Sequence, residues 1–255
     1  MSGADGFART IHPSAMVDPL ARLERDVFIG PFCVVGPKVV LGRGTKLVSH
    51  VVIDGDTTLG EGNIFYPFAV IGMAPQVRRI EKEGRLVIGA RNTFREHVTI
   101  HPGLEETRIG DDCLFMVSAH VAHDATVGSN VTVANGVQIA GHVVVEDHVN
   151  FGGLAAIAQH VRIGEGAFVA GGAMVERPVP PFVIAQGDRA RPRGINRIGL
   201  ERRGVSEEII RELERAYAET LLAREHSLRE AATRLSPKSE EAKRFRDALL
   251  AIAEP

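Results

Sequence analysis

The sequence is poor in large aromatic side chains and in cysteine. Its 255 residues include no tryptophan, two tyrosines and two cysteines, against 27 glycines. Cys33 and Cys113 stand far apart, which argues against a disulfide framework and against a cysteine metal pair. We expect a core of small and branched side chains with both thiols inside it.

A strong net charge and long apolar runs are also missing. The net charge is -2 and the sequence pI is about 6.6, so no basic field favours a nucleic-acid partner. No apolar run approaches the roughly 18 to 20 residues of a membrane-spanning helix, and residues 1–9 lack the apolar core of a signal peptide. We therefore expect a cytoplasmic protein with no transmembrane segment and no nucleic-acid partner.

An apolar residue recurs at every sixth position without a miss, from Ile11 to Ile71 and again from Ile109 to Val175. The residue four places later is small, and both cysteines fall in this second slot. This period is the hexapeptide pattern of a parallel β-helix, whereas a sandwich of short strands requires no fixed period. The hexads resemble those of left-handed β-helices, in which three hexads, each with one short strand, make one triangular coil. Left-handed winding is a known exception to the right-handed crossover rule.

The predicted fold class is therefore mainly β, with a left-handed parallel β-helix over residues 1–187 and a small C-terminal α-helical domain over residues 188–255. Two breaks in the hexads, between Ile71 and Ile88 and between Ile100 and Ile109, predict insertions that leave the coil as loops. Each loop is either a lid or clamp over the substrate, or a surface loop without a role in binding.

After the coil, the run Pro178-Val179-Pro180-Pro181 is expected to end the repeat, because proline cannot donate to a strand ladder. Residues 189–203 contain six arginines against one glutamate, which suits either a solvated basic linker or a phosphate or acidic-partner site. Ser206 suits a helix N-cap, and Ile209, Leu213, Ala216 and Tyr217 fall on one helical face. Two further helices are expected over residues 228–235 and 240–252.

Positions three hexads apart in an uninterrupted β-helix stack about 4.8 Å from one another, which converts sequence spacing into contact. His123, Gly141 and Gln159 then form one column, and Asp124, His142 and His160 form the adjacent one. By the same count, His120 stacks on Gln138. Residues spread over forty positions thus converge on one patch of the surface.

These residue types suit acyl transfer by direct attack. Histidine serves as a general base near neutral pH, because its ordinary pKa is about 6.5. A neighbouring glycine lets substrate approach the backbone, whose N–H is able to stabilise an oxyanion. The patch offers no serine or cysteine at its centre as a nucleophile, so the substrate must supply a hydroxyl or an amine of its own.

The chain resembles the bacterial UDP-N-acetylglucosamine acyltransferases that start lipid A synthesis by moving a 3-hydroxyacyl chain from acyl carrier protein to the sugar 3-hydroxyl. The resemblance covers about residues 10–222. It is carried by these segments: Ile29-Gly30-Pro31-Phe32-Cys33, Ser49-His50-Val51-Val52, Val98-Thr99-Ile100-His101, Ala119-His120-Val121-Ala122-His123-Asp124, Ala140-Gly141-His142, the run Val179 to Gly187, Gly194-Ile195-Asn196 and Gly199-Leu200-Glu201-Arg202-Arg203-Gly204.

The resemblance implies that His123 is the general base, that Asp124 assists it, and that the Gly141 N–H faces the oxyanion. It implies a homotrimer with active sites between subunits, no cofactor, no metal, and acyl carrier protein and a nucleotide sugar as partners. It places Gly171 at the acyl-chain ruler, the position that limits the length of the bound acyl chain. A small residue there favours a longer chain. Substrate contacts are implied for Gln76, His120, His142, Gln159, Asn196, Arg202 and Arg203. Arginine forks suit a diphosphate.

Three departures from the family pattern concern the acceptor. Val77 replaces an acidic residue after the glutamine, Ile198 replaces a glutamate, and Ala158-Gln159 replaces a His-Gln pair, with His160 following it. Each change removes a polar contact, worth about 1 kcal/mol. A 3-amino nucleotide sugar or another glycan acceptor therefore stays open.

Two other function classes also stay open. One is a metal hydratase of the carbonic anhydrase type, with zinc held by His120, His123 and His142. The other is a non-catalytic scaffold, suggested by the altered acceptor residues.

Overall fold

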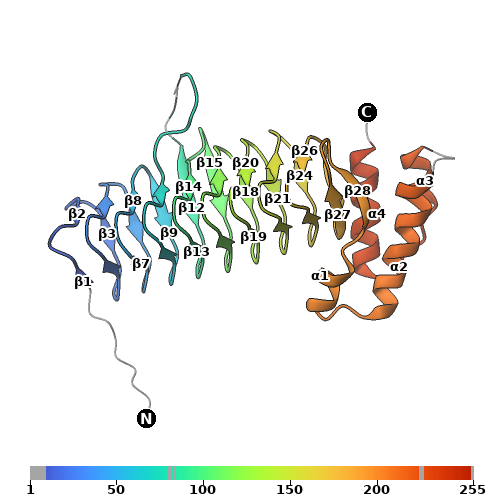
Figure 1. Ribbon diagram of the computed structural model, residues 1–255, viewed down its shortest axis with the longest axis horizontal. Coiled ribbons are helices and arrows are strands. Elements are labelled where there is room, and N and C mark those ends of the chain that lie inside the picture. The colour runs from blue at the N-terminus through green and yellow to red at the C-terminus, as the bar shows by residue number, and fades with distance from the viewer. Residues whose placement is uncertain (1–9, 80–81, 83, 224–226, 254–255) are drawn as a thin grey trace, which may run out of the picture.

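The computed structural model describes residues 10–79, 82, 84–223 and 227–253. Over these residues the chain forms a parallel β-solenoid with a group of helices at its C-terminal end (Figure 1). Both parts of the predicted fold are thereby confirmed. Residues 1–9 and 254–255, at the outer ends of the two expected domains, lie outside the described residues.

Within the described residues, three sheets run along the solenoid, with eleven, nine and eight strands. Sheet A contains β1 (Thr10–Ile11), β4 (Phe28–Ile29), β7 (Lys46–Leu47), β10 (Ile64–Phe65), β13 (Thr93–Phe94), β16 (Leu114–Phe115), β19 (Thr132–Val133), β22 (Asn150–Phe151), β25 (Phe168–Val169), β27 (Val183–Gln186) and β28 (Arg191–Ile195). Sheet B contains β2 (Met16–Val17), β5 (Val34–Val35), β8 (Val52–Ile53), β11 (Val70–Ile71), β14 (Thr99–Ile100), β17 (His120–Val121), β20 (Gln138–Ile139), β23 (Ala156–Ile157) and β26 (Met174–Val175). Sheet C contains β3 (Arg22–Leu23), β6 (Val40–Leu41), β9 (Thr57–Leu59), β12 (Arg85–Ile88), β15 (Glu106–Ile109), β18 (Thr126–Val127), β21 (Val144–Val145) and β24 (Arg162–Ile163).

The strand register is the one that the hexads predict. Thr10 pairs with Phe28 and His120 pairs with Gln138, each three hexads further on. From the second coil onward, the hexad residue is buried and the residue before it points outward or is half-buried. Phe65, Phe94 and Phe115 fill the interior under sheet A, with ring centroids 4.6 and 5.1 Å apart.

Both cysteines lie in the core as free thiols, as expected. Burial raises the pKa of Cys113 to about 11 and also raises the pKa of Cys33. A thiol held protonated in this way is a packing group rather than a nucleophile.

Both insertions appear in the register. Ile64 pairs with Thr93 instead of with the residue three hexads further on, because the segment after β11 leaves the coil as a projecting loop (Figure 1). Residues 80, 81 and 83 of this loop lie outside the described residues. Thr93 then pairs with Leu114, so the second insertion adds half a hexad to one corner.

The prolines do not end the solenoid as expected. Val179 forms a parallel bridge with Ile163, and β27 pairs in parallel with β25. The ladder continues because the bridging N–H belongs to Val179, which lies between the prolines and donates to Arg162. The arginine-rich segment is likewise no simple linker. It forms β28, which pairs antiparallel with β27, and then helix α1 (Arg197–Arg202). The domain boundary expected at residue 187 falls in this hairpin turn, and the division at that point stays a prediction.

The helices begin at the expected serine. Ser206 caps α2 (Glu207–Tyr217) by accepting from the Ile209 N–H, and the chain continues as a π-helical turn, η1 (Ala218–Leu222). Helices α3 (Leu228–Arg234) and α4 (Glu240–Ile252) match the other two predicted helices. Three of the four predicted apolar positions of α2 are buried, but Ile210 is buried in place of Ile209. Helix α2 packs against β28 and α4, so the helices cover the C-terminal end of the coil.

No helix in the part of the chain that the structure describes combines the length and apolarity needed to cross a membrane.

Candidate active site

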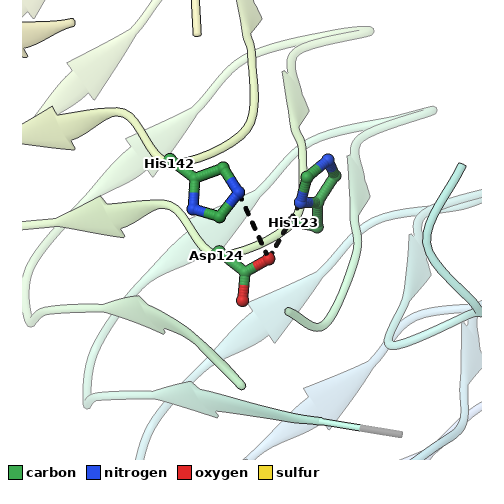
Figure 2. A group of neighbouring side chains, drawn as sticks. All are labelled: His123, Asp124 and His142. Atoms are coloured by element: carbon green, nitrogen blue, oxygen red, sulfur yellow. Dashed lines mark hydrogen bonds and ion pairs between the residues drawn. The ribbon is translucent and has the colours of Figure 1, made fainter. Parts of the chain in front are cut away.

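His123 and Asp124 occupy the corner between β17 and β18, where they form a hydrogen-bonded pair (Figure 2). The His123 Nδ1 atom lies 2.9 Å from Asp124 Oδ2. Asp124 adopts a left-handed backbone conformation with φ of 56°, and its N–H donates to the buried Thr107 hydroxyl at 2.8 Å. The turn therefore fixes the carboxylate beside the imidazole.

The second insertion holds this carboxylate from the other side. The Glu105 N–H donates to Asp124 Oδ1 at 3.0 Å. A Cβ atom on Gly103 would lie 2.1 Å from the same oxygen, so any larger residue at this position would displace the carboxylate. The insertion expected to form a lid or clamp thus also positions Asp124.

The surroundings of Asp124 favour its charged form. Burial alone raises the pKa of the carboxyl. Hydrogen bonds from the backbone of Glu105 and Leu104 and from the His123 side chain act the other way, as does the nearby His142. Together they outweigh the effect of burial, so the pKa of Asp124 is lowered. An ionised carboxylate only accepts hydrogen bonds, so the proton of the pair resides on His123 Nδ1. His123 Nε2 is then left with a free lone pair.

A cavity of about 260 Å³ opens beside His123 on the outer side of sheet B. Gln76 reaches it from the first loop. The cavity is lined by Gln76, His101, His120, Ala122, His123, Gln138, Ile139, Ala140, Gly141, Ala156, Ile157 and Gln159. The sequence-derived column of His123, Gly141 and Gln159 therefore meets at one cavity, and His120 joins it from β17.

Gly141 packs directly against the His123 ring. A Cβ atom there would lie 2.7 Å from His123 Cε1 and 2.8 Å from Nε2. Within the described residues, no group accepts a hydrogen bond from the Gly141 N–H. A glycine at this corner gives the imidazole room and leaves one backbone donor available beside it.

The second predicted column is also assembled. His142 Nε2 lies 3.8 Å from Asp124 Oδ2, and the His142 ring stands edge-on to His123 with centroids 5.2 Å apart (Figure 2). His160 stacks on His142 at 4.7 Å with the rings nearly parallel. Both outer histidines are exposed, so this column forms the outer rim of the site.

A family model described as UDP N-acetylglucosamine O-acyltransferase, domain 2, matches residues 179–253, and a model of bacterial transferase hexapeptide repeats matches residues 20–55 and 106–141. LpxA from Acinetobacter baumannii is 38% identical, with 94% of this chain and 96% of that chain covered at a TM-score of 0.88. LpxA from Bacteroides fragilis, a UDP-N-acetylglucosamine acyltransferase, is 33% identical, with 93% and 96% covered at a TM-score of 0.90. The chain belongs to the UDP-N-acetylglucosamine O-acyltransferase family.

The same enzyme from Campylobacter jejuni is 34% identical, with 93% of this chain and 95% of that chain covered at a TM-score of 0.88. The similarity spans the solenoid and the helices, so the whole described chain is an acyltransferase of this kind.

Three residues expected to contact substrate lie away from the cavity of this acyltransferase chain. The Asn196 side chain caps α1 by accepting from the Gly199 N–H at 3.1 Å, and it donates to the Gly166 carbonyl at 3.0 Å. Arg203 pairs with Glu165 at 2.5 Å and lies over the Phe182 ring. Arg202 is exposed at the end of α1. Within one chain, the cavity and these two arginines therefore lie apart from each other.

Gly171, expected at the acyl-chain ruler, also lies outside the cavity lining. It occupies the corner between β25 and β26, exposed, one coil beyond Gly153. A Cβ atom at Gly171 would lie 3.3 Å from the Gly153 carbonyl oxygen, so a larger residue requires a small shift there.

His101 is a cavity residue of this acyltransferase that sequence reasoning missed. It appeared in a motif segment, but the count by three hexads does not reach it, because the second insertion lengthens the spacing between β14 and β17. Counted in the observed register, His101 follows directly after the Ile100–Val121 pair and stands beside Ala122. The strand register was therefore the signal that could have found it.

One group of side chains in the described part of the acyltransferase has metal-ligand geometry. His123, Asp124 and His142 place one ligand atom each within 4.8 Å of one another. His120, expected in the zinc alternative, is not in this group, and its Nδ1 atom pairs with the Thr99 hydroxyl at 2.8 Å. A cation here would also take the place of the proton that His123 shares with Asp124.

Proposed function

We propose that this acyltransferase moves a 3-hydroxyacyl chain from acyl carrier protein to the 3-hydroxyl of UDP-N-acetylglucosamine, the first step of lipid A synthesis, in the cytoplasm. The observation that carries the proposal is the His123–Asp124 pair at 2.9 Å, with the imidazole lining a sugar-sized cavity. Family membership supplies the sugar nucleotide, because the relatives are UDP-N-acetylglucosamine acyltransferases.

In the proposed mechanism, His123 Nε2 takes the proton of the sugar hydroxyl as that oxygen attacks the thioester carbonyl of the donor. The carbonyl oxygen becomes an oxyanion facing the Gly141 N–H. When the intermediate collapses, the carbon–sulfur bond breaks, and His123 returns the proton to the departing thiolate, which leaves as the free thiol of the carrier. Asp124 stays ionised throughout and stabilises the imidazolium.

Substrate contacts divide between two regions of the chain. Gln76, His120 and Gln159 line the cavity, and His142 stands at its rim. Asn196, Arg202 and Arg203 lie elsewhere on the same chain. We infer a homotrimer in which these residues of one subunit approach the cavity of its neighbour, where arginine is suited to the diphosphate.

Val77, Ala158 and Ile198 stand where the family pattern has polar residues and bear on the identity of the acceptor. Val77 and Ala158 offer no polar side-chain atom, and Ile198 presents an exposed aliphatic side chain on α1. A 3-amino nucleotide sugar is the second candidate, since the same base and cavity serve an amine nucleophile. Gly171 favours a long acyl chain under either alternative.

A mass-detected turnover assay tests the proposal. Purified protein is incubated with a series of 3-hydroxyacyl carrier proteins of increasing chain length, with either UDP-N-acetylglucosamine or its 3-amino analogue as acceptor. The expected product is the O-acylated sugar nucleotide, fastest with a long chain. Product from the amino analogue alone would assign the second acceptor, and no product from either would refute the acyl-transfer proposal.

A further inference from the structure

The Asp124 carboxylate lies between two imidazoles that belong to successive coils of the solenoid (Figure 2). Its Oδ2 atom is 2.9 Å from His123 Nδ1 and 3.8 Å from His142 Nε2. One ligand atom from each of the three residues lies within 4.8 Å of the other two. The Asp124 side chain is 9% exposed, whereas that of His142 is 43% exposed, so solvent reaches this group from the His142 side.

The ligand atoms of this group suit a metal ion of the zinc class. Imidazole nitrogen together with carboxylate oxygen is a common zinc ligand set, with a fourth position left to water. Calcium and magnesium, by contrast, prefer oxygen ligands. Zinc bonds of about 2.0–2.2 Å in a tetrahedron place the ligand atoms roughly 3.4 Å apart. The 2.9 and 3.8 Å contacts of Asp124 bracket that separation, so small side-chain rotations complete the site.

The next coil supports His142 in this position. The His160 ring stacks on the His142 ring with centroids 4.7 Å apart and an interplanar angle of 7°. The family pattern instead has its histidine two residues earlier, where this chain has Ala158. In this chain the stack therefore extends the outer column by one coil, and it limits the His142 ring to motion within its own plane.

We propose that His123, Asp124 and His142 form an inhibitory binding site for a divalent transition-metal ion of the zinc class. The metal is an inhibitor of this chain and not its cofactor. The effect on turnover rests on the proposed function, in which His123 is the base, whereas metal binding itself does not.

A metal at this place acts on His123 without entering the cavity. A neutral imidazole has one nitrogen with a free lone pair, and the hydrogen bond to Asp124 leaves that lone pair on Nε2. Zinc takes the lone pair of Nδ1, so the Nδ1 hydrogen passes to solvent and a solvent proton binds Nε2. His123 Nε2 is then a donor and no longer accepts the proton of the acceptor hydroxyl. Neither Asp124 nor His142 lines the cavity, so the acceptor still enters it.

Two phenylalanine substitutions test the site. His142→Phe removes one ligand nitrogen and keeps an aromatic ring for the stack with His160. Phenylalanine suits this corner, because Phe32 and Phe68 occupy corners with φ of 59° and 66°, close to the 59° of His142. His148→Phe is the matched control, since His148 lies in the turn between β21 and β22 with φ of 60° and belongs to no metal-ligand group of the described residues.

The first measurement is calorimetric titration of the full-length, metal-free protein with zinc chloride. Wild type and His148→Phe should bind one zinc ion per chain with the same Kd. His142→Phe should bind zinc about 100-fold more weakly, because loss of even an outer partner of a zinc ligand costs roughly 10–100-fold in affinity. Circular dichroism confirms that each variant folds.

The second measurement is steady-state turnover with and without zinc, in which each variant is compared with its own zinc-free rate. Zinc should lower the kcat of wild type with little change in the KM for UDP-N-acetylglucosamine, and a chelator should restore the rate. The zinc concentration that halves the rate should rise in His142→Phe in proportion to its Kd for zinc.

A wild-type protein that does not bind zinc, or an equal Kd in His142→Phe, would overturn the site. A rise in KM without a fall in kcat would place the metal in the cavity and would also overturn it. A zinc-free wild-type protein without acyl-transfer activity would refute the proposed function, and the zinc titration would still decide the metal site.

Discussion

Asp124 accepts a hydrogen bond from the Nδ1 atom of His123 at 2.9 Å while its other oxygen accepts from the Glu105 N–H at 3.0 Å. The first contact fixes the imidazole tautomer, and the second fixes the carboxylate. The two contacts together leave His123 Nε2 as the basic atom beside the cavity. Catalysis in this chain is expected to depend on the whole arrangement and not on the histidine alone.

Asp124→Asn should lower kcat by about 10²-fold or more, since general-base catalysis contributes roughly 10²–10⁴-fold and the asparagine no longer enforces the tautomer. Binding of UDP-N-acetylglucosamine should change much less, because Asp124 does not line the cavity. Steady-state kinetics paired with calorimetry separates the two effects. A variant that loses binding and keeps its kcat would contradict the assigned role.

The same carboxylate predicts a pH dependence of stability. The folded pKa of Asp124 is lowered below its unfolded value of about 3.9, so the carboxylate contributes stability above that pH, and the contribution is lost as pH falls through the folded pKa. The free energy of unfolding of wild type minus that of Asp124→Asn should therefore be constant near pH 5 and shrink toward pH 3. Denaturant unfolding at a series of pH values measures it, and a difference that grows on acidification would show the opposite linkage.

Gly141→Ala should impair turnover while the fold is retained. The new Cβ atom would lie 2.7 Å from the His123 ring, so the imidazole must move from its position beside the Gly141 N–H. A displaced base is expected to cost about 10²-fold in kcat. Gly153→Ala is the matched control, since the nearest atom to its Cβ lies at 3.5 Å in another corner of the solenoid. Equal activities of the two variants would show that the clash is relieved without consequence.

Glu165→Gln should loosen the attachment of the helices to the coil. This carboxylate is 13% exposed and pairs with Arg203 after α1 and with Arg244 on α4. Loss of charged hydrogen bonds at this site should lower the free energy of unfolding by about 1–2 kcal/mol. Glu61→Gln, which breaks the exposed pair with Arg43, should cost under about 0.5 kcal/mol. Urea unfolding monitored by helical circular dichroism compares them, and equal losses would contradict the prediction.

The proposed homotrimer, with active sites shared between subunits, predicts complementation. His123→Ala lacks the proposed base, and Arg202→Ala lacks a cationic side chain far from the cavity of its own chain. In mixed trimers formed at equal ratio, about a quarter of the sites should combine an intact His123 with a neighbour's intact Arg202. Mixing after partial denaturation and refolding should therefore restore activity above that of either parent. No recovery would place both residues in one chain's site.

Sequence periodicity predicted the solenoid and the columns of the site, because a fixed spacing of three hexads turns distant positions into neighbours. His123, Gly141 and Gln159 follow from this spacing alone. His101 does not, because the second insertion changes the local spacing, and its Met73 contact depends on the path of a loop. Nor did the sequence reveal that the Asn196 amide is hydrogen-bonded within its own chain, since Gly166 meets it only through the packing of α1 on the last coils.

The most direct test of the proposed chemistry is the single-turnover rate of His123→Ala under saturating 3-hydroxyacyl carrier protein and UDP-N-acetylglucosamine, with binding of both substrates verified separately. With His123 Nε2 as the base, the rate should fall by about 10²–10⁴-fold while both substrates still bind. A His123→Ala protein that turns over at the wild-type rate would contradict the assignment of the base.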